Sequence, residues 1–195
     1  MLDKLGEIIE ASTAEFTVEC YELYAAPALG SLIKTSDGDV EMYGVVYNTT
    51  TESMDPGRKP LARGKDEKDE ADIYRSSPQL SVLFRTNFNA FVIGHKIADD
   101  INRYLPPRPA RIHSFVYELD EGEIQAFTKV LDFLYILATA PVVGSNDEVV
   151  AACLRNAAKV QDDTRSFLIG AGKELAVLLS AEPHRLEAIL RRIRP

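Results

Sequence analysis

The period of the hydrophobic pattern changes near residue 120, and this change constrains the fold more than any other feature of the sequence. Before it, segments such as "EFTVECYEL" alternate, with Phe16, Val18 and Cys20 on one face and polar residues on the other. After it, apolar residues recur at helical spacing. The stripe consists of Ile124, Phe127, Val130, Leu131, Leu134 and Leu137. The sequence therefore predicts an α+β chain, with a strand domain over residues 1–118 and a helical domain over residues 119–195.

Short strand-like runs separated by turn residues fill the first part of the chain. After a first run that ends at Ile8 and Ile9, the runs are "EFTVECYEL", "SLIKT", "VEMYGVVYN", "LSVLFRT" and "NAFVIGH". The sequence "SDGD" supplies a turn with Asp-Gly at its centre, and Gly44 inside a run indicates a bulge or a tight bend. Because no helix intervenes between these runs, we predict a small antiparallel β-barrel and not a parallel sheet.

Start and stop signals divide the second part of the chain into helices. Asp120, followed three residues later by Glu123, resembles a capping box, and Pro141 ends a helix predicted over Asp120–Thr139. Asn146 is the predicted cap of the next helix. The segment "DDTRSFLIGAGKELAVLLS" is a third helical stretch, either separate from the second or continuous with it. A last short helix has Pro183 in its first turn.

A charged, Pro/Gly-rich excursion over residues 49–79 interrupts the strand pattern. It contains Pro-Gly, Lys-Pro and Arg-Gly pairs and a dense run of mixed charge, so it lacks the apolar residues of a core element. Within it, "KDEKDEADIYR" has the composition of one or two helical turns. A connection of this length inside a compact domain is either functional or mobile. Two interpretations stay open, a solvated loop and a partner-docking arm.

Charge and cysteine content limit the class of protein. The net charge of -8 opposes a main role in coating nucleic acid or an anionic membrane. Cys20 and Cys153 have no second cysteine or histidine at zinc spacing, so we expect reduced thiols packed as small hydrophobic groups. The longest apolar candidate, "FLYILATAPVVG", is interrupted by Pro141, and the N-terminus has no signal-peptide character. We therefore expect a cytoplasmic protein without membrane association.

No motif in the sequence has the spacing of a catalytic site. The segment "GAGKEL" (Gly170–Leu175) lacks the first glycine and the hydroxyl residue of a phosphate-binding loop, and it lies in a helical pattern. The histidines, His95, His113 and His184, are scattered along the chain. We expect no catalytic residues, no metal and no cofactor, and hence no ATP hydrolysis.

Four segments of the N-terminal half point to a known family. In their strand, glycine and proline placements, "LGEIIEASTAEFTVEC", "PALGSLIKT", "VEMYGVVYN" and "FNAFVIGH" resemble the HAS barrel. This small β-barrel stands at the N-terminus of HerA-type DNA-translocating ATPases and of rotary ATP synthase subunits. The segment "LPPRPARIHSFVYELDEGEI" is similar to the Pro-rich exit from that barrel, and residues 55–88 look like the excursion of stand-alone bacterial members. The resemblance covers roughly residues 3–123.

The resemblance does not extend to the HerA motor. That motor has a phosphate loop, an acidic magnesium site and an arginine finger, whereas the residues after 123 show a helical pattern without a phosphate loop. What the resemblance implies is the non-catalytic role of the barrel, which in hexameric relatives packs into a ring and holds subunits or a partner.

We therefore expect a non-enzymatic assembly or adaptor protein that mediates oligomerisation, with a homo-oligomer favoured, or partner docking. The alternative is an accessory factor of a HerA-type DNA translocase and nuclease system, with weak nucleic-acid contact. Arg103, Arg108 and Arg111 make the Pro-rich exit basic and are candidate contact residues. Phe133 and Ile136 lie off the main helical stripe and need cover from the barrel or from a second subunit.

Limited proteolysis tests the interpretation of the excursion. Because residues 49–79 are charged and poor in large apolar side chains, the first cuts are expected between Arg58 and Lys68. Mass spectrometry of the early fragments locates them. First cuts inside the helical half would contradict the assignment.

Overall fold

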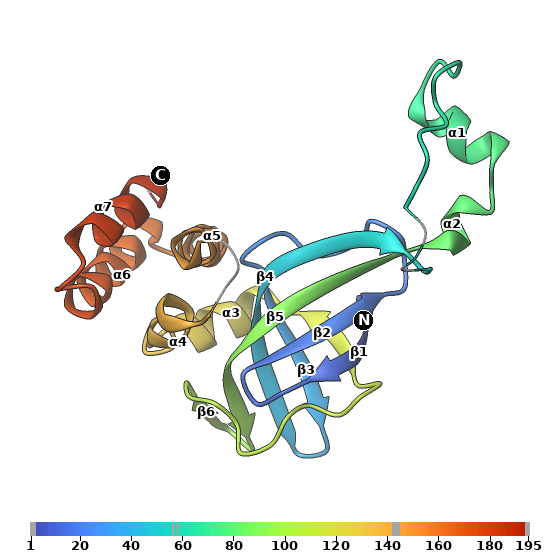
Figure 1. The fold of residues 1–195 in the computed structure, drawn as a ribbon. Coiled ribbons are helices and arrows are strands. Elements are labelled where there is room, and N and C mark those ends of the chain that lie inside the picture. The colour runs from blue at the N-terminus through green and yellow to red at the C-terminus, as the bar shows by residue number, and fades with distance from the viewer. Residues whose placement is uncertain (1–2, 56, 58, 142–144, 194–195) are drawn as a thin grey trace.

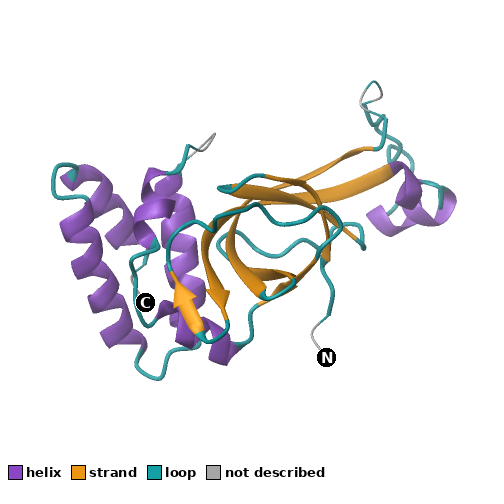
Figure 2. Ribbon diagram, turned by 90° about the horizontal axis from the view of Figure 1, so that it is seen from below, coloured by secondary structure: helices purple, strands orange, loops and turns teal. Residues whose placement is uncertain are grey.

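The computed structural model of the 195-residue chain describes residues 3–55, 57, 59–141 and 145–193. It contains a closed six-stranded antiparallel β-barrel with helices packed against one side (Figures 1 and 2). The last strand ends at Glu118 and the C-terminal helices begin at Glu121. The predicted α+β class, the antiparallel barrel and the change of period near residue 120 are therefore confirmed.

The barrel closes because its first and last strands in sheet order pair with each other. The strands are β1 (Gly6–Ala11), β2 (Glu15–Cys20), β3 (Leu32–Asp37), β4 (Val40–Ser53), β5 (Phe84–Ile97), β6 (Asp100–Asn102) and β7 (Phe115–Glu118). Their order is β2-β1-β7-β3-β4-β5, and the pairing of β2 with β5 completes the ring. The short β6 pairs only with the end of β5 and lies outside the ring. Closure leaves no free edge among the six barrel strands.

Alternating residues of the strands fill the barrel. Phe16 and Val18 are buried there, as the period-2 pattern predicts. The rest of the interior comprises Ile8, Ile33, Met42, Val46, Phe88, Ala90, Val92, Ala110 and Val116. The predicted irregularity at Gly44 is confirmed, because the β4–β5 register shifts between Tyr43 and Gly44. A Cβ at Gly44 would lie 3.1 Å from the ring of Phe16, so the bend brings the backbone close to the core.

The prediction of a strand over "LSVLFRT" is wrong in its first half. Leu80–Leu83 forms the short helix α2, and β5 runs without interruption from Phe84 to Ile97. The partner strand β4 ends at Ser53 and is followed by the turn sequence "MDPG". Residues before Phe84 therefore have no strand to pair with. Leu80 and Val82 donate their backbone N–H groups to carbonyls three residues earlier, and the carbonyl of Leu83 accepts from the N–H of Met54.

The prediction of one helix over Asp120–Thr139 is also corrected. The helices are α1 (Glu70–Ser76), α2 (Leu80–Leu83), α3 (Glu121–Thr128), α4 (Leu134–Thr139), α5 (Asn146–Ala158), α6 (Thr164–Leu178) and α7 (Pro183–Arg192). The helix is interrupted between α3 and α4. This interruption lets Phe127 and Phe133 both join the apolar cluster that includes the outer face of the barrel. The capping box of Asp120 and Glu123 is confirmed. Ser145, and not Asn146, is the N-cap residue of α5.

One apolar layer joins the barrel to the helices. Strands β3, β4 and β5 turn apolar side chains outward as well as inward, and α3, α4 and α5 cover them (Figure 1). The ring of Phe127 lies 4.8 Å from that of Tyr43 and 5.2 Å from that of Phe133, measured between centroids. The outward strand residues are Leu32, Tyr43, Val45, Phe91 and Ile93. Helices α6 and α7 pack on the other side of α5 and complete this layer.

Gly30 lies where the barrel meets α5. Its φ of +78° is in the region that favours glycine. A Cβ at this position would lie 2.4 Å from the backbone nitrogen of Cys153 and 2.5 Å from the carbonyl carbon of Ala152. Both atoms belong to the backbone of a helix and cannot move aside independently. Gly30 therefore permits the closest approach between the barrel and the helices.

Substituting Gly30 should weaken the contact between barrel and helices. Gly30→Ala is expected to cost about 1–3 kcal/mol for its backbone conformation and roughly 1–3 kcal/mol more for the clash with α5. Gly38→Ala is the matched control, since Gly38 has a φ of +60° and no atom within 4 Å of its added Cβ. Urea unfolding of both variants measures the difference. Equal losses in the two variants would contradict the role assigned to Gly30.

Candidate docking surface

Strands β4 and β5 continue beyond the barrel as a two-stranded ribbon. The pairing of β2 with β5 ends at Asn87, whereas β4 and β5 stay paired as far as Ser53 and Phe84. We call residues 50–86 the arm and residues 54–83 the arm tip. Figures 1 and 2 show the arm projecting from the side of the barrel opposite the helices α3 to α7. The strand thus extends past Thr49, where the excursion was predicted to begin, and the tip includes α2.

Polar contacts fix the root of the arm. The buried hydroxyl of Thr86 accepts a hydrogen bond of 2.9 Å from the backbone N–H of Tyr24. It also lies within hydrogen-bond distance, 3.0 Å, of the hydroxyl of Thr51. The guanidinium of Arg85 pairs with Glu52 across the ribbon at 2.7 Å. The direction of the ribbon is therefore set by the barrel.

One contact ties α1 back to the body. The hydroxyls of Tyr24 and Tyr74 are hydrogen-bonded, and their rings meet edge to face with centroids 6.5 Å apart. Tyr24 has a φ of +68°, a strained conformation for a residue of this size. Sequence reasoning missed these residues, because Tyr24 and Tyr74 belong to segments without a periodic pattern and are joined only by the fold.

The arm tip encloses an open, mainly apolar groove of about 1330 Å³. Its apolar lining includes Met54, Leu61, Ile73, Leu80, Leu83 and Phe84. Leu61 is 80% exposed, and Val82 of α2, also in the arm tip, is 72% exposed. Helix α1 has seven residues and none is buried. A helix this short is unstable in water without packing. We therefore interpret the tip as an apolar surface that becomes buried when another molecule packs against it.

The charges of the tip are separated along the chain. Lys59, Arg63 and Lys65 are exposed and make no ion pair with another described residue. Acidic residues follow at once, starting with Asp66 and Glu67. Inside the tip, the described ion pairs are those of Arg75 with Asp69 and Asp72. Arg58 lies outside the described residues.

The three arginines of the Pro-rich exit lie in different surroundings. Arg103 donates to the carbonyls of Phe127 at 2.8 Å and Ala126 at 3.0 Å, which are free acceptors at the end of α3. Burial lowers the pKa of Arg103 from its usual value. Arg111 lies 3.5 Å from a carboxylate oxygen of Asp37, and Arg108 is exposed. Arg103 thus stabilises the connection to the helices and is not free to contact a partner.

The helix residues predicted as an interaction surface lie mostly inside the chain. Phe133 is fully buried against the barrel, and Ile136 is half-buried. Of the two alternatives left open, cover from the barrel therefore applies to Phe133. On the same helix Tyr135 is exposed, but it is a single ring and not a patch.

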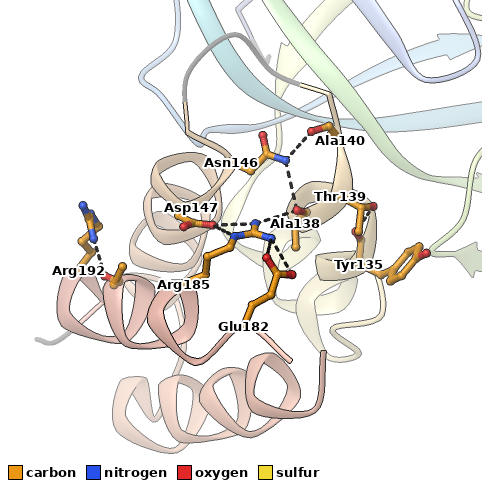
Figure 3. A network of polar contacts seen from close by, with 10 residues as sticks. Tyr135, Ala138, Thr139, Ala140, Asn146, Asp147, Glu182, Arg185 and Arg192 are labelled. Carbon is orange, nitrogen blue, oxygen red and sulfur yellow. Dashed lines mark hydrogen bonds and ion pairs between the residues drawn. The ribbon is translucent and has the colours of Figure 1, made fainter. Parts of the chain in front are cut away.

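A polar clasp holds the ends of three helices together (Figure 3). Arg185 at the start of α7 donates to Asp147 of α5 at 2.8 Å and to the carbonyl of Ala138 in α4 at 3.0 Å. The same guanidinium pairs with Glu182, and Asn146 donates to the same carbonyl of Ala138. The bond to Asp147 raises the pKa of Arg185 above its usual value. The clasp supports the helical layer and has no open site for a ligand.

The structure places the histidines and cysteines considered in the sequence in separate surroundings. His95 donates its Nδ1–H to the carbonyl of Tyr104, whereas Nδ1 of His113 lies 3.0 Å from a carboxylate oxygen of Glu7. Burial raises the pKa of the Cys20 thiol to about 11 and that of the Cys153 thiol to about 12, so both stay protonated at neutral pH. The segment "GAGKEL" lies within α6, not in a loop after a strand. Among the described residues, no three His, Cys, Asp or Glu side chains are placed to hold a metal ion.

Comparisons with known proteins give no family for the chain. No family model matches it, and no curated protein matches it. None of the helices in the described ranges has both the length and the hydrophobicity needed to cross a bilayer.

The clasp should contribute measurably to stability. Arg185→Ala leaves the carboxylate of Asp147 without its donor and the carbonyl of Ala138 with Asn146 alone, and is expected to cost about 2–3 kcal/mol. Arg191→Ala in the same helix removes only an exposed ion pair with Glu187 and should change the unfolding free energy by less than about 1 kcal/mol. Urea unfolding checks both. Similar values for the two variants would show that the clasp adds nothing.

Proposed function

We propose that the chain is a non-enzymatic assembly or adaptor protein that docks through its arm. The observation that carries this proposal is an apolar, uncovered tip held on a fixed ribbon beyond the barrel. The apolar layer between barrel and helices is buried within the chain, whereas Leu61 and Val82 in the tip are 80% and 72% exposed. Surfaces of this kind mark protein contacts.

The resemblance to the HAS barrel supports the same proposal. A closed antiparallel barrel over residues 6–118 agrees with the architecture that the resemblance implies. We propose on this basis that the barrel is a HAS-like, HerA-like module without a motor, and that the protein is cytoplasmic, since Cys20 and Cys153 are free thiols. Of the arginines that support the alternative role beside a DNA translocase, Arg103 donates to carbonyls of α3, whereas Arg108 and Arg111 are exposed.

Site-directed photo-cross-linking tests whether the arm is the docking element. A photoreactive amino acid at Leu61 is expected to give protein adducts in native extract, whether with a second copy or with another protein. Val177 in α6 is the matched control, since it is 75% exposed and lies far from the arm. Adducts from Leu61 that disappear when the full-length protein is added as competitor, and that are absent at Val177, support the proposal. No adduct at Leu61, or equal adducts at both positions, would overturn it.

A further inference from the structure

The unpaired charges of the arm tip have an order that restricts what can bind there. A basic stretch, Lys59 to Lys65, is followed directly by a mainly acidic stretch, Asp66 to Glu70, in which Lys68 stands among four carboxylates, and the charged residues of both stretches are exposed. The described basic side chains in this stretch have no ion-pair partner among the described residues. Neither a uniformly acidic nor a uniformly basic partner would satisfy both stretches, because one of the two would face like charge.

A second copy of the same tip satisfies both stretches. In a two-fold symmetric contact each surface meets itself in reverse, so the basic stretch of one copy faces the acidic stretch of the other, and the reverse holds at the same time. The charge changes sign between Lys65 and Asp66, which is where the two-fold axis would pass. Each copy then supplies carboxylates to the basic side chains of the other, of which the described ones have no ion-pair partner within the described chain, while Asp69 keeps its pair with Arg75.

The apolar features of the tip have the same self-complementary character. The exposed side chain of Leu61 stands at the edge of the open groove, so each copy offers one protruding group and one hollow. The tip comprises the 30 residues from 54 to 83, about the number that one side of a standard interface contributes. Because the ribbon holds the tip away from the barrel, a second copy approaches without contact between the two bodies (Figure 1).

We infer that the arm tip binds the arm tip of a second copy of this chain, in a two-fold symmetric contact between the 59–65 and 66–70 stretches. This inference rests on the proposed docking role of the arm and names its occupant. The contact includes exposed ion pairs, so added salt weakens it.

Paired charge reversals test the inference. Variant one carries Lys59→Glu, Arg63→Glu and Lys65→Glu, and variant two carries Asp66→Lys, Glu67→Lys and Glu70→Lys. In each variant alone the two stretches have the same sign, and the dissociation constant of the homodimer is expected to rise roughly 100-fold, because symmetry doubles every unfavourable contact. Mixed in equal amounts, the variants present opposite charges at both contacts, and dimers form again. Analytical ultracentrifugation of each variant and of the mixture measures this.

Two controls separate a failed inference from a failed docking role. A variant with residues 54–83 replaced by Asn-Gly joins the paired ends Ser53 and Phe84 by a two-residue turn, and should be monomeric with an unchanged barrel. Dimers in this variant would overturn the inference. A wild-type monomer at micromolar concentration, or no recovery in the mixture, would also overturn it. If Leu61 then still cross-links to a different protein, the arm docks a foreign partner, and if it cross-links to nothing, the docking role fails as well.

Discussion

The packing of α3, α4 and α5 on the outer face of β3, β4 and β5 is the contact on which the body depends. The outward residues Tyr43 and Phe91 would be exposed on an isolated barrel, and the buried side of α5 would be exposed on isolated helices. Each fully buried side chain of this kind contributes roughly 1.5–3 kcal/mol, so neither half retains its stability alone. Gly30 makes the contact close, and the ion pair of Lys34 in β3 with Glu123 in α3 fixes its edge. Barrel and helices therefore form one cooperative body.

This shared layer explains why the arm is the site of interest. The body buries its largest apolar side chains, Phe133 among them, although single apolar residues such as Ile169 and Val177 of α6 are exposed. The arm has the reverse property. Its root is fixed by Thr86 and Tyr24, while its tip carries exposed aliphatic groups and a helix, α1, without a buried residue. Rigid placement of an uncovered surface is what a docking element needs, because little entropy is lost when the base is already ordered.

The sequence predicted what depends on local periodicity and missed what depends on tertiary contact. The barrel strands, the capping box at Asp120 and the bulge at Gly44 follow from local patterns and were confirmed. The break between α3 and α4 was missed because a continuous helical stripe does not reveal that both Phe127 and Phe133 must reach the barrel. The consecutive apolar residues Phe91 to Ile93 could have predicted that helices cover the outer face of β5, since such runs are typical of strands buried on both faces. The root contacts of the arm join residues 33 to 62 positions apart in sequence, the contact of Tyr24 with Tyr74 spans 50, and none left a local signature.

The marginal packing of the tip also determines how strongly it can bind. Helix α1 has no buried residue, so part of any interaction energy is spent on ordering the tip when a partner docks. The hydrogen bond between Tyr74 and Tyr24 reduces that cost by holding α1 near the root before binding. Exposed ion pairs add little to the affinity of the contact, but they make that affinity depend strongly on the register of the two surfaces and on salt. A contact built from these parts is specific and readily reversible, which fits an adaptor better than a permanent subunit interface.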